Sequence, residues 1–143
     1  MQTFSFSGQH VCVAASGRVP VKKLFPWGTK KDTIPPLTIV ADPDQPALIV
    51  FPENVSPLPP EIAPLAAIFS ATAAVDGSGR LQIGQQNLNH IKLGRSGKVV
   101  LVGKESFFLI WGEDQWKQQG LPAYRAEFSQ RLSALPLLAH RHA

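Results

Sequence analysis

Two short segments, Ser16-Gly17-Arg18 and Ser78-Gly79-Arg80, contain the residues best suited to contact a partner. The glycine allows the backbone a positive φ, which a tight turn between two strands often requires. The arginine that follows is placed to form paired hydrogen bonds with a phosphate group. It could instead form a salt bridge with a neighbouring carboxylate, and the sequence leaves both alternatives open.

No other group of residues has the spacing of a catalytic or metal-binding site. The pair His140-x-His142 has no cysteine or carboxylate cluster beside it, and Cys12 is the one cysteine, whereas structural zinc needs about four ligands. Residues 94–98 lack the first glycine and the final Ser or Thr of a phosphate-binding loop. No G-x-S-x-G nucleophile elbow occurs. We therefore predict a protein that is not an enzyme and that uses no metal, cofactor or small-molecule substrate.

Composition favours a basic protein with an anionic partner. The formal net charge of +4 suits nucleic acid, and the charged fraction of 17% is below the usual quarter, as expected if part of the surface is covered in an assembly. A single cysteine argues for a reducing compartment. No apolar run approaches the roughly 18 residues of a membrane span, and no secretion signal opens the chain. We expect a cytoplasmic protein that does not contact a membrane.

The segments around the two turns form an internal repeat, in which Arg80 follows Arg18 by 62 positions. Each turn is followed by a predicted hairpin, because two apolar runs flank a turn-rich segment at residues 42–46 and again at 103–106. The hairpins end in the related segments 51–54 and 111–114. We therefore predict two halves, residues 1–70 and 71–143, that together form one compact unit.

Three helices are predicted outside the strands. Residues 85–93 form one candidate, which Gly94 ends, and Glu61–Phe69 forms a short second one. The third extends from about Pro122 to Leu135, where apolar residues recur every three or four positions and make one stripe along the helix.

The second half resembles the MraZ family, which is related to the AbrB/SpoVT-type swapped-hairpin transcription regulators. The resemblance depends on the pattern V-D-x-x-G-R-L-x-I at residues 75–83, V-V-L-V-G at 99–103, F-x-L-x-W at 107–111, and Trp116. The first half shows a weaker copy, with Gly17-Arg18 and the strand 48–51.

This resemblance implies a fold that is mainly β with short helices (α+β). The expected architecture is a duplicated β-α-β, swapped-hairpin, AbrB-like barrel with two pseudo-symmetric halves. It also implies a sequence-specific DNA-binding transcription regulator that binds tandem direct repeats upstream of a cell division and cell wall operon. Such proteins assemble as homo-oligomeric rings, and they would be associated with the nucleoid.

The resemblance also implies which residues contact DNA, because family members read DNA mainly through a D-x-K-G-R turn in the first half. Here Ala14 replaces the aspartate and Ser16 the lysine, while Asp76, Gly79 and Arg80 remain in the second copy. Asp76 is expected to accept backbone N–H bonds within its turn. The loss of the lysine removes a phosphate contact that nearby lysines would have to replace. Arg18 is the expected principal contact, and the full predicted set is Ser16, Gly17, Arg18, Lys22, Lys23 and Arg80.

A different class of function remains open, namely an oligomeric scaffold or protein-interaction module that has kept the fold and lost DNA binding. A DNA-binding protein must gather Arg18 and the lysines at 22, 23 and 31 on one face, with Arg80 beside them or on the opposite rim. A scaffold would scatter these cations or cover them in a subunit interface. Trp111 and Trp116 are expected in the core or between subunits.

Overall fold

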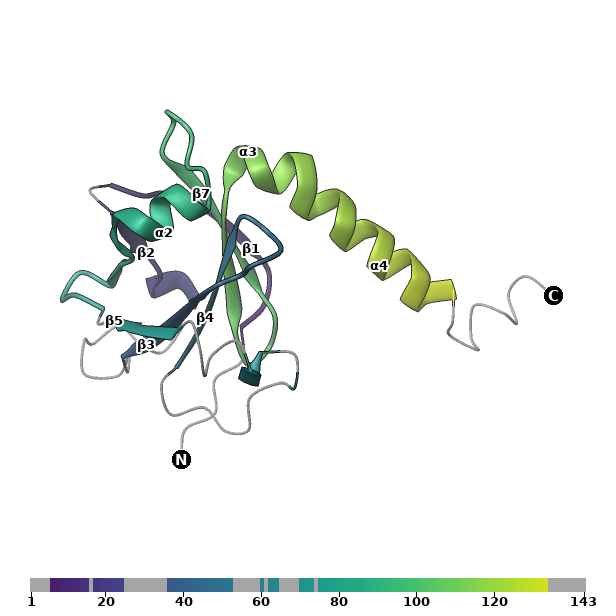
Figure 1. Cartoon of the computed structure of the whole chain (residues 1–143), viewed down its shortest axis with the longest axis horizontal. Coiled ribbons are helices and arrows are strands. Elements are labelled where there is room, and N and C mark those ends of the chain that lie inside the picture. The colour runs from purple at the N-terminus through teal and green to yellow at the C-terminus, as the bar shows by residue number, and fades with distance from the viewer. Residues whose placement is uncertain are drawn as a thin grey trace.

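The structure is a computed structural model, and it describes residues 6–15, 17–24, 36–52, 60, 62–64, 70–73 and 75–133. Of the predicted features, Ser16, Lys31 and most of the helix Glu61–Phe69 lie outside this description. The described residues form mostly strands with short helices (Figure 1), which confirms the mixed α+β class.

The larger sheet has six antiparallel strands, and both predicted hairpins are part of it. Its inner strands are rich in β-branched and other apolar residues, and they are buried along almost their whole length, because both faces of the sheet are covered. In spatial order the strands are β1 (Gln9–Val13), β7 (Lys98–Gly103), β8 (Phe108–Gly112), β4 (Ala47–Pro52), β3 (Leu37–Ala41) and β5 (Ser70–Ala73).

The order of the strands exchanges elements between the two halves of the chain. Strand β1 belongs to the first half and pairs with β7 of the second, while β5 of the second half pairs with β3 of the first. The two hairpins meet in the middle of the sheet through β4 and β8. Each half therefore completes the sheet of the other, as a swapped arrangement requires.

A second, two-stranded sheet pairs β2 (Arg18–Pro20) with β6 (Arg80–Gln82). Val19 lies opposite Leu81, and outside this pair the backbone bonds come in matched sets. The Val21 N–H donates to the Gly79 carbonyl at 3.0 Å, and the Ile83 N–H donates to the Gly17 carbonyl at 2.9 Å. The two donors, Val21 and Ile83, are 62 positions apart, and so are the two acceptors, Gly17 and Gly79. The ribbon therefore has a local two-fold symmetry that relates the two repeats.

The principal core lies between the ribbon and the inner face of the larger sheet. Val19 and Leu81 are fully buried there, and Phe6 meets Phe108 edge-on with ring centroids 5.2 Å apart. The residues that alternate with Arg18 and Arg80 along the ribbon are therefore anchored in the core, which leaves the arginines on the opposite side of the strands.

The larger sheet does not close into the expected barrel. Strands β1 and β5 are its two edges and do not pair with each other, because β2 and β6 pair together as a separate ribbon. On the β1 edge, Val11 and Val13 have exposed fractions of 55% and 53%.

The predicted helices at 85–93 and 122–135 are confirmed as α2 (Gly84–His90) and α4 (Leu121–Ser133). Helix α4 continues from α3 (Glu113–Gln115) and a π-helical turn, η3 (Trp116–Gly120), and it extends away from the sheets (Figure 1). Pro122 lacks the N–H that an α-helix would use at this point, and the wider π turn directly precedes it. Among the described residues, no helix is long and apolar enough to cross a bilayer.

Candidate nucleic-acid interface

Asp76 organises the second glycine-arginine turn, as the sequence predicts. Its Oδ1 atom accepts the N–H of Ser78 at 2.8 Å and the N–H of Arg80 at 3.0 Å. The Gly79 N–H donates to the Asp76 carbonyl, and Gly79 has a φ of 78°, which a residue with a side chain rarely adopts. The side chain of Asp76 therefore holds this turn in a single shape.

The first turn has a different, tighter closure. Ala15 and Arg18 exchange both backbone hydrogen bonds, at 3.0 and 3.1 Å, and Gly17 has a φ of 73°. In the second copy the equivalent closure is one residue wider, between Asp76 and Arg80. Because Ala14 stands where the second copy has Asp76, no carboxylate is available to hold a wider turn.

Arg18 and Arg80 lie beside each other and share Asp76. The Nη1 atom of Arg18 is 4.0 Å from Asp76 Oδ2, and the Nε atom of Arg80 is 3.3 Å from the same oxygen. Both side chains remain more than one-third exposed, at 46% and 38%. The salt-bridge alternative is thus present in the structure, but both contacts are longer than the roughly 2.8 Å of a charge-assisted hydrogen bond.

The pKa of Asp76 is held below its ordinary value, chiefly by the backbone N–H of Arg80. Partial burial opposes this effect, while the N–H of Ser78 and the charges of Arg80 and Arg18 add to it. The carboxylate is therefore ionised at neutral pH and offers its second oxygen to both guanidinium groups.

Gln82 also contacts this site, although the sequence analysis did not select it. Its Oε1 atom accepts a hydrogen bond from Arg18 Nε at 3.0 Å, and the two residues are partners in the β2–β6 register. The sequence does indicate this position, because Gln82 is the polar residue between Leu81 and Ile83. Side chains alternate along a strand, so Gln82 lies on the same side as Arg80.

Lys22 lies next to the second turn. Its side chain packs over Gly79, since a Cβ atom added there would be 2.8 Å from the Cβ of Lys22. Lys22 and Lys23 are in a short 3₁₀ helix, η1 (Lys22–Leu24), and the side chain of Lys23 is outside the described part. Arg18 and Arg80 thus lie together on the ribbon, where both pair with Asp76, and Lys22 lies beside the Gly79 turn.

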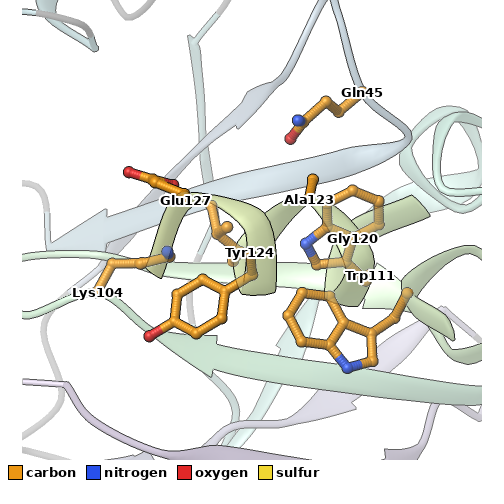
Figure 2. Close-up of a pocket in the computed structure, with 9 residues that line it drawn as sticks. Gln45, Lys104, Trp111, Gly120, Ala123, Tyr124 and Glu127 are labelled. Carbon is orange, nitrogen blue, oxygen red and sulfur yellow. The ribbon is translucent and has the colours of Figure 1, made fainter. Parts of the chain in front are cut away.

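A second place of interest is a small pocket of about 90 Å³ where the turn η3 and α4 cover the outer face of the sheet. Figure 2 shows Trp111, Gly120 and Tyr124 around it, with Lys104 near the Tyr124 ring. The Trp111 and Trp116 rings are 5.7 Å apart and both are buried, so their predicted core packing is confirmed. The Lys104 ammonium lies 4.2 Å from the Tyr124 ring centroid, and burial lowers its pKa. The contacts of Trp116 with Trp111 and of Tyr124 with Lys104 hold the first turns of the projecting helix against the sheet.

The described residues include no group of three or more His, Cys, Asp or Glu that could hold a metal ion. The chemistry that the ribbon supports is the binding of an anion by guanidinium and ammonium groups.

Comparison with known families matches residues 69–135 to the MraZ family model, which is described as "MraZ protein, putative antitoxin-like". The matched segment lies in the second half of the chain and spans just under half of its 143 residues. It contains β5 to α4, including Asp76, Arg80 and the projecting helix. The resemblance inferred from the sequence is thus confirmed for this half. No curated protein matches the chain.

Proposed function

We propose that the protein is a sequence-specific DNA-binding transcription regulator of MraZ type. In this proposal it binds tandem direct repeats upstream of a cell division and cell wall operon, and it acts at the nucleoid without catalysing a reaction. The observation that carries the proposal is the gathering of Arg18, Arg80 and Lys22 on one ribbon.

The ribbon has the physical properties that a DNA contact needs. Its two glycine turns are followed by arginines whose side chains are 46% and 38% exposed, so both guanidinium groups can be reached by a phosphate backbone. Phosphate contacts supply most of the non-specific affinity and fix the register of the protein on the duplex. Ser16, Gly17 and Lys23 belong to the proposed surface by their positions next to Arg18 and Lys22. Arg18 remains the principal proposed contact because it is the more exposed arginine.

Assembly into a homo-oligomeric ring is part of the proposal. Helix α4 exposes Tyr124, Phe128 and Leu132, and the exposed fraction of Phe128 is 52%. Between α4 and the sheet is an open groove of about 740 Å³, which includes the apolar residues Ile49 and Leu109. In this proposal the exposed apolar residues of α4 in one copy contact the partly apolar groove of the next, and a head-to-tail contact of this kind forms a ring when the rotation between copies closes. Several subunits on tandem sites would then raise the overall affinity through effective concentration.

The alternative is an oligomeric scaffold or interaction module that has lost DNA binding. One observation favours it, namely that the family match covers the second half and does not extend to Arg18. The two hypotheses differ in what they require of Arg18, which is a DNA contact in the first and a dispensable surface residue in the second.

Fluorescence anisotropy separates them. The probes are labelled duplexes from the promoter region that carries the direct repeats, with scrambled duplexes of the same composition. The proteins are the wild type, Arg18→Ala, and Arg125→Ala as a control that removes an equal charge from the exposed surface of α4. We expect tighter binding to the repeats, strong weakening by salt, and loss in Arg18→Ala alone. Equal weak binding to both duplexes by all three proteins would refute the proposal and favour the scaffold.

A further inference from the structure

We infer that Arg18 and Arg80 bind one DNA phosphate together, as a single clamp whose gap Asp76 occupies in the free protein. This inference rests on the proposed DNA-binding function and adds the stoichiometry of the contact. The usual expectation from an internal repeat would be two related sites, one for each arginine.

The geometry of the ribbon makes the two arginines neighbours. Both approach the same oxygen, Asp76 Oδ2, at 4.0 and 3.3 Å, so the Arg18 Nη1 and Arg80 Nε atoms are separated by no more than about 7 Å, the sum of these distances. A charge-assisted hydrogen bond spans about 2.8 Å. Two such bonds to the free oxygens of one phosphate therefore bridge a gap of this size.

The charges at the ribbon are unequal because the repeat is imperfect. The arginine is present in both copies, whereas the carboxylate is present as Asp76 and is absent at the equivalent Ala14. One aspartate therefore faces two guanidinium groups, and Lys22 adds a further positive charge beside Gly79. The alanine at residue 14, which weakens the match to the family motif, leaves two guanidinium groups to share one carboxylate among the described residues, so an added anion can pair with them.

Asp76 orients the arginines without saturating them. Its Oδ1 atom is committed to the turn, through the N–H groups of Ser78 and Arg80. Within the described part of the chain, its Oδ2 atom makes only the two long contacts, and Arg80 Nε is shielded from solvent without a hydrogen-bond partner. A phosphate that draws the two guanidinium groups away from Oδ2 therefore breaks two weak contacts, gains two short hydrogen bonds and leaves Asp76 and its turn in place.

The salt dependence of duplex binding measures how many DNA phosphates the protein contacts. We would measure the wild type, Arg18→Ala, Arg80→Ala and the double variant on a labelled duplex, with Arg125→Ala as the charge-matched control. Each phosphate contact contributes about 0.9 to the slope of log K against log salt. For a shared phosphate, the double variant loses about 0.9 from the slope for each engaged subunit. Two separate phosphates would give a loss of about 1.8 for each engaged subunit, twice that of either single variant, and would overturn the inference.

Inorganic phosphate gives a second readout that does not need DNA. Phosphate should raise the thermal midpoint of the wild type above that in chloride of equal ionic strength, because it binds the folded state. Either single substitution should abolish this shift, while Arg125→Ala retains it. A shift that persists in either single variant, or no shift in the wild type, would overturn the clamp. Phosphate stabilisation without duplex binding would refute the DNA function and leave the clamp standing.

Discussion

The substitution Gly79→Ala tests how tightly the second turn is built. Gly79 has a φ of 78°, and an added Cβ would be 2.8 Å from the Cβ of Lys22, which belongs to a stiff part of that side chain. A left-handed conformation costs an alanine about 1–2 kcal/mol. Overpacking adds about 1–3 kcal/mol. We therefore expect Gly79→Ala to lower the free energy of unfolding by roughly 2–5 kcal/mol.

Gly84→Ala is the matched control, because Gly84 has a φ of 80° and an added Cβ there has no atom within 4 Å. It should show the backbone cost alone, about 1–2 kcal/mol. With an unfolding entropy of about 2.1 cal/mol/K for each residue, 1 kcal/mol corresponds to roughly 3 °C for a chain of this length. Gly79→Ala should therefore lower the thermal midpoint by roughly 7–17 °C and Gly84→Ala by roughly 3–7 °C.

The assay is thermal unfolding followed by circular dichroism, with urea unfolding at 25 °C to obtain free energies directly. Combining Gly79→Ala with Lys22→Gly removes the contacting Cβ atom, so part of the excess loss should be recovered. Equal losses in Gly79→Ala and Gly84→Ala would show that Lys22 does not press on the turn, and the packing described for this site would be wrong.

Three further predictions concern charge and assembly. Because the pKa of Asp76 is lowered in the folded state, its contribution to stability is present above its ordinary pKa of 3.8 and is lost as pH falls through the lowered value; Asp76→Asn should remove this part of the acid dependence of urea unfolding. Burial lowers the pKa of Lys104, so the unfolded chain binds more protons than the folded protein between that lowered pKa and the ordinary pKa of 10.5. The free energy of unfolding should therefore rise with pH in this range, and Lys104→Met should flatten the rise. Phe128→Ser should reduce the oligomer mass measured by light scattering, whereas Arg125→Ser should not; an unchanged mass would exclude the α4 stripe as the contact.

Local sequence patterns predicted the elements whose signals are themselves local. The turn-rich segment at residues 42–46 located the β3–β4 hairpin, and the spacing of Tyr124 and Phe128 located α4. The family resemblance implied a swapped arrangement but did not specify that β1 and β5 are the exchanged strands, and no local periodicity encodes a pairing such as Gln9 with Val102. The open edges of the sheet were not foreseen for the same reason.

The sequence predicted which residues belong to the candidate site better than it predicted how those residues are arranged. The repeat identified Arg18 and Arg80, but it left open whether they lie together, and the β2–β6 register answers that question. The tighter first turn follows from the absence of a carboxylate at Ala14. The sequence shows that absence, but it does not show its effect on the geometry of the turn. The contact of Lys22 with Gly79 depends on tertiary packing and has no signal in the sequence.

The exchange of strands also affects how the protein is made. During translation the first half emerges from the ribosome with β1 and β3 but without β7, β8 and β5, the strands that pair with them or with β4. Strand β4, which contains Leu48 and Val50, can pair with β3 at once, but its other partner, β8, is complete only when residue 112 has been synthesised. Domains that complete their pairing at such long separations fold slowly and expose strand edges while they wait. Synthesis of this chain should therefore depend on chaperones that hold the nascent first half, more than its modest length would suggest.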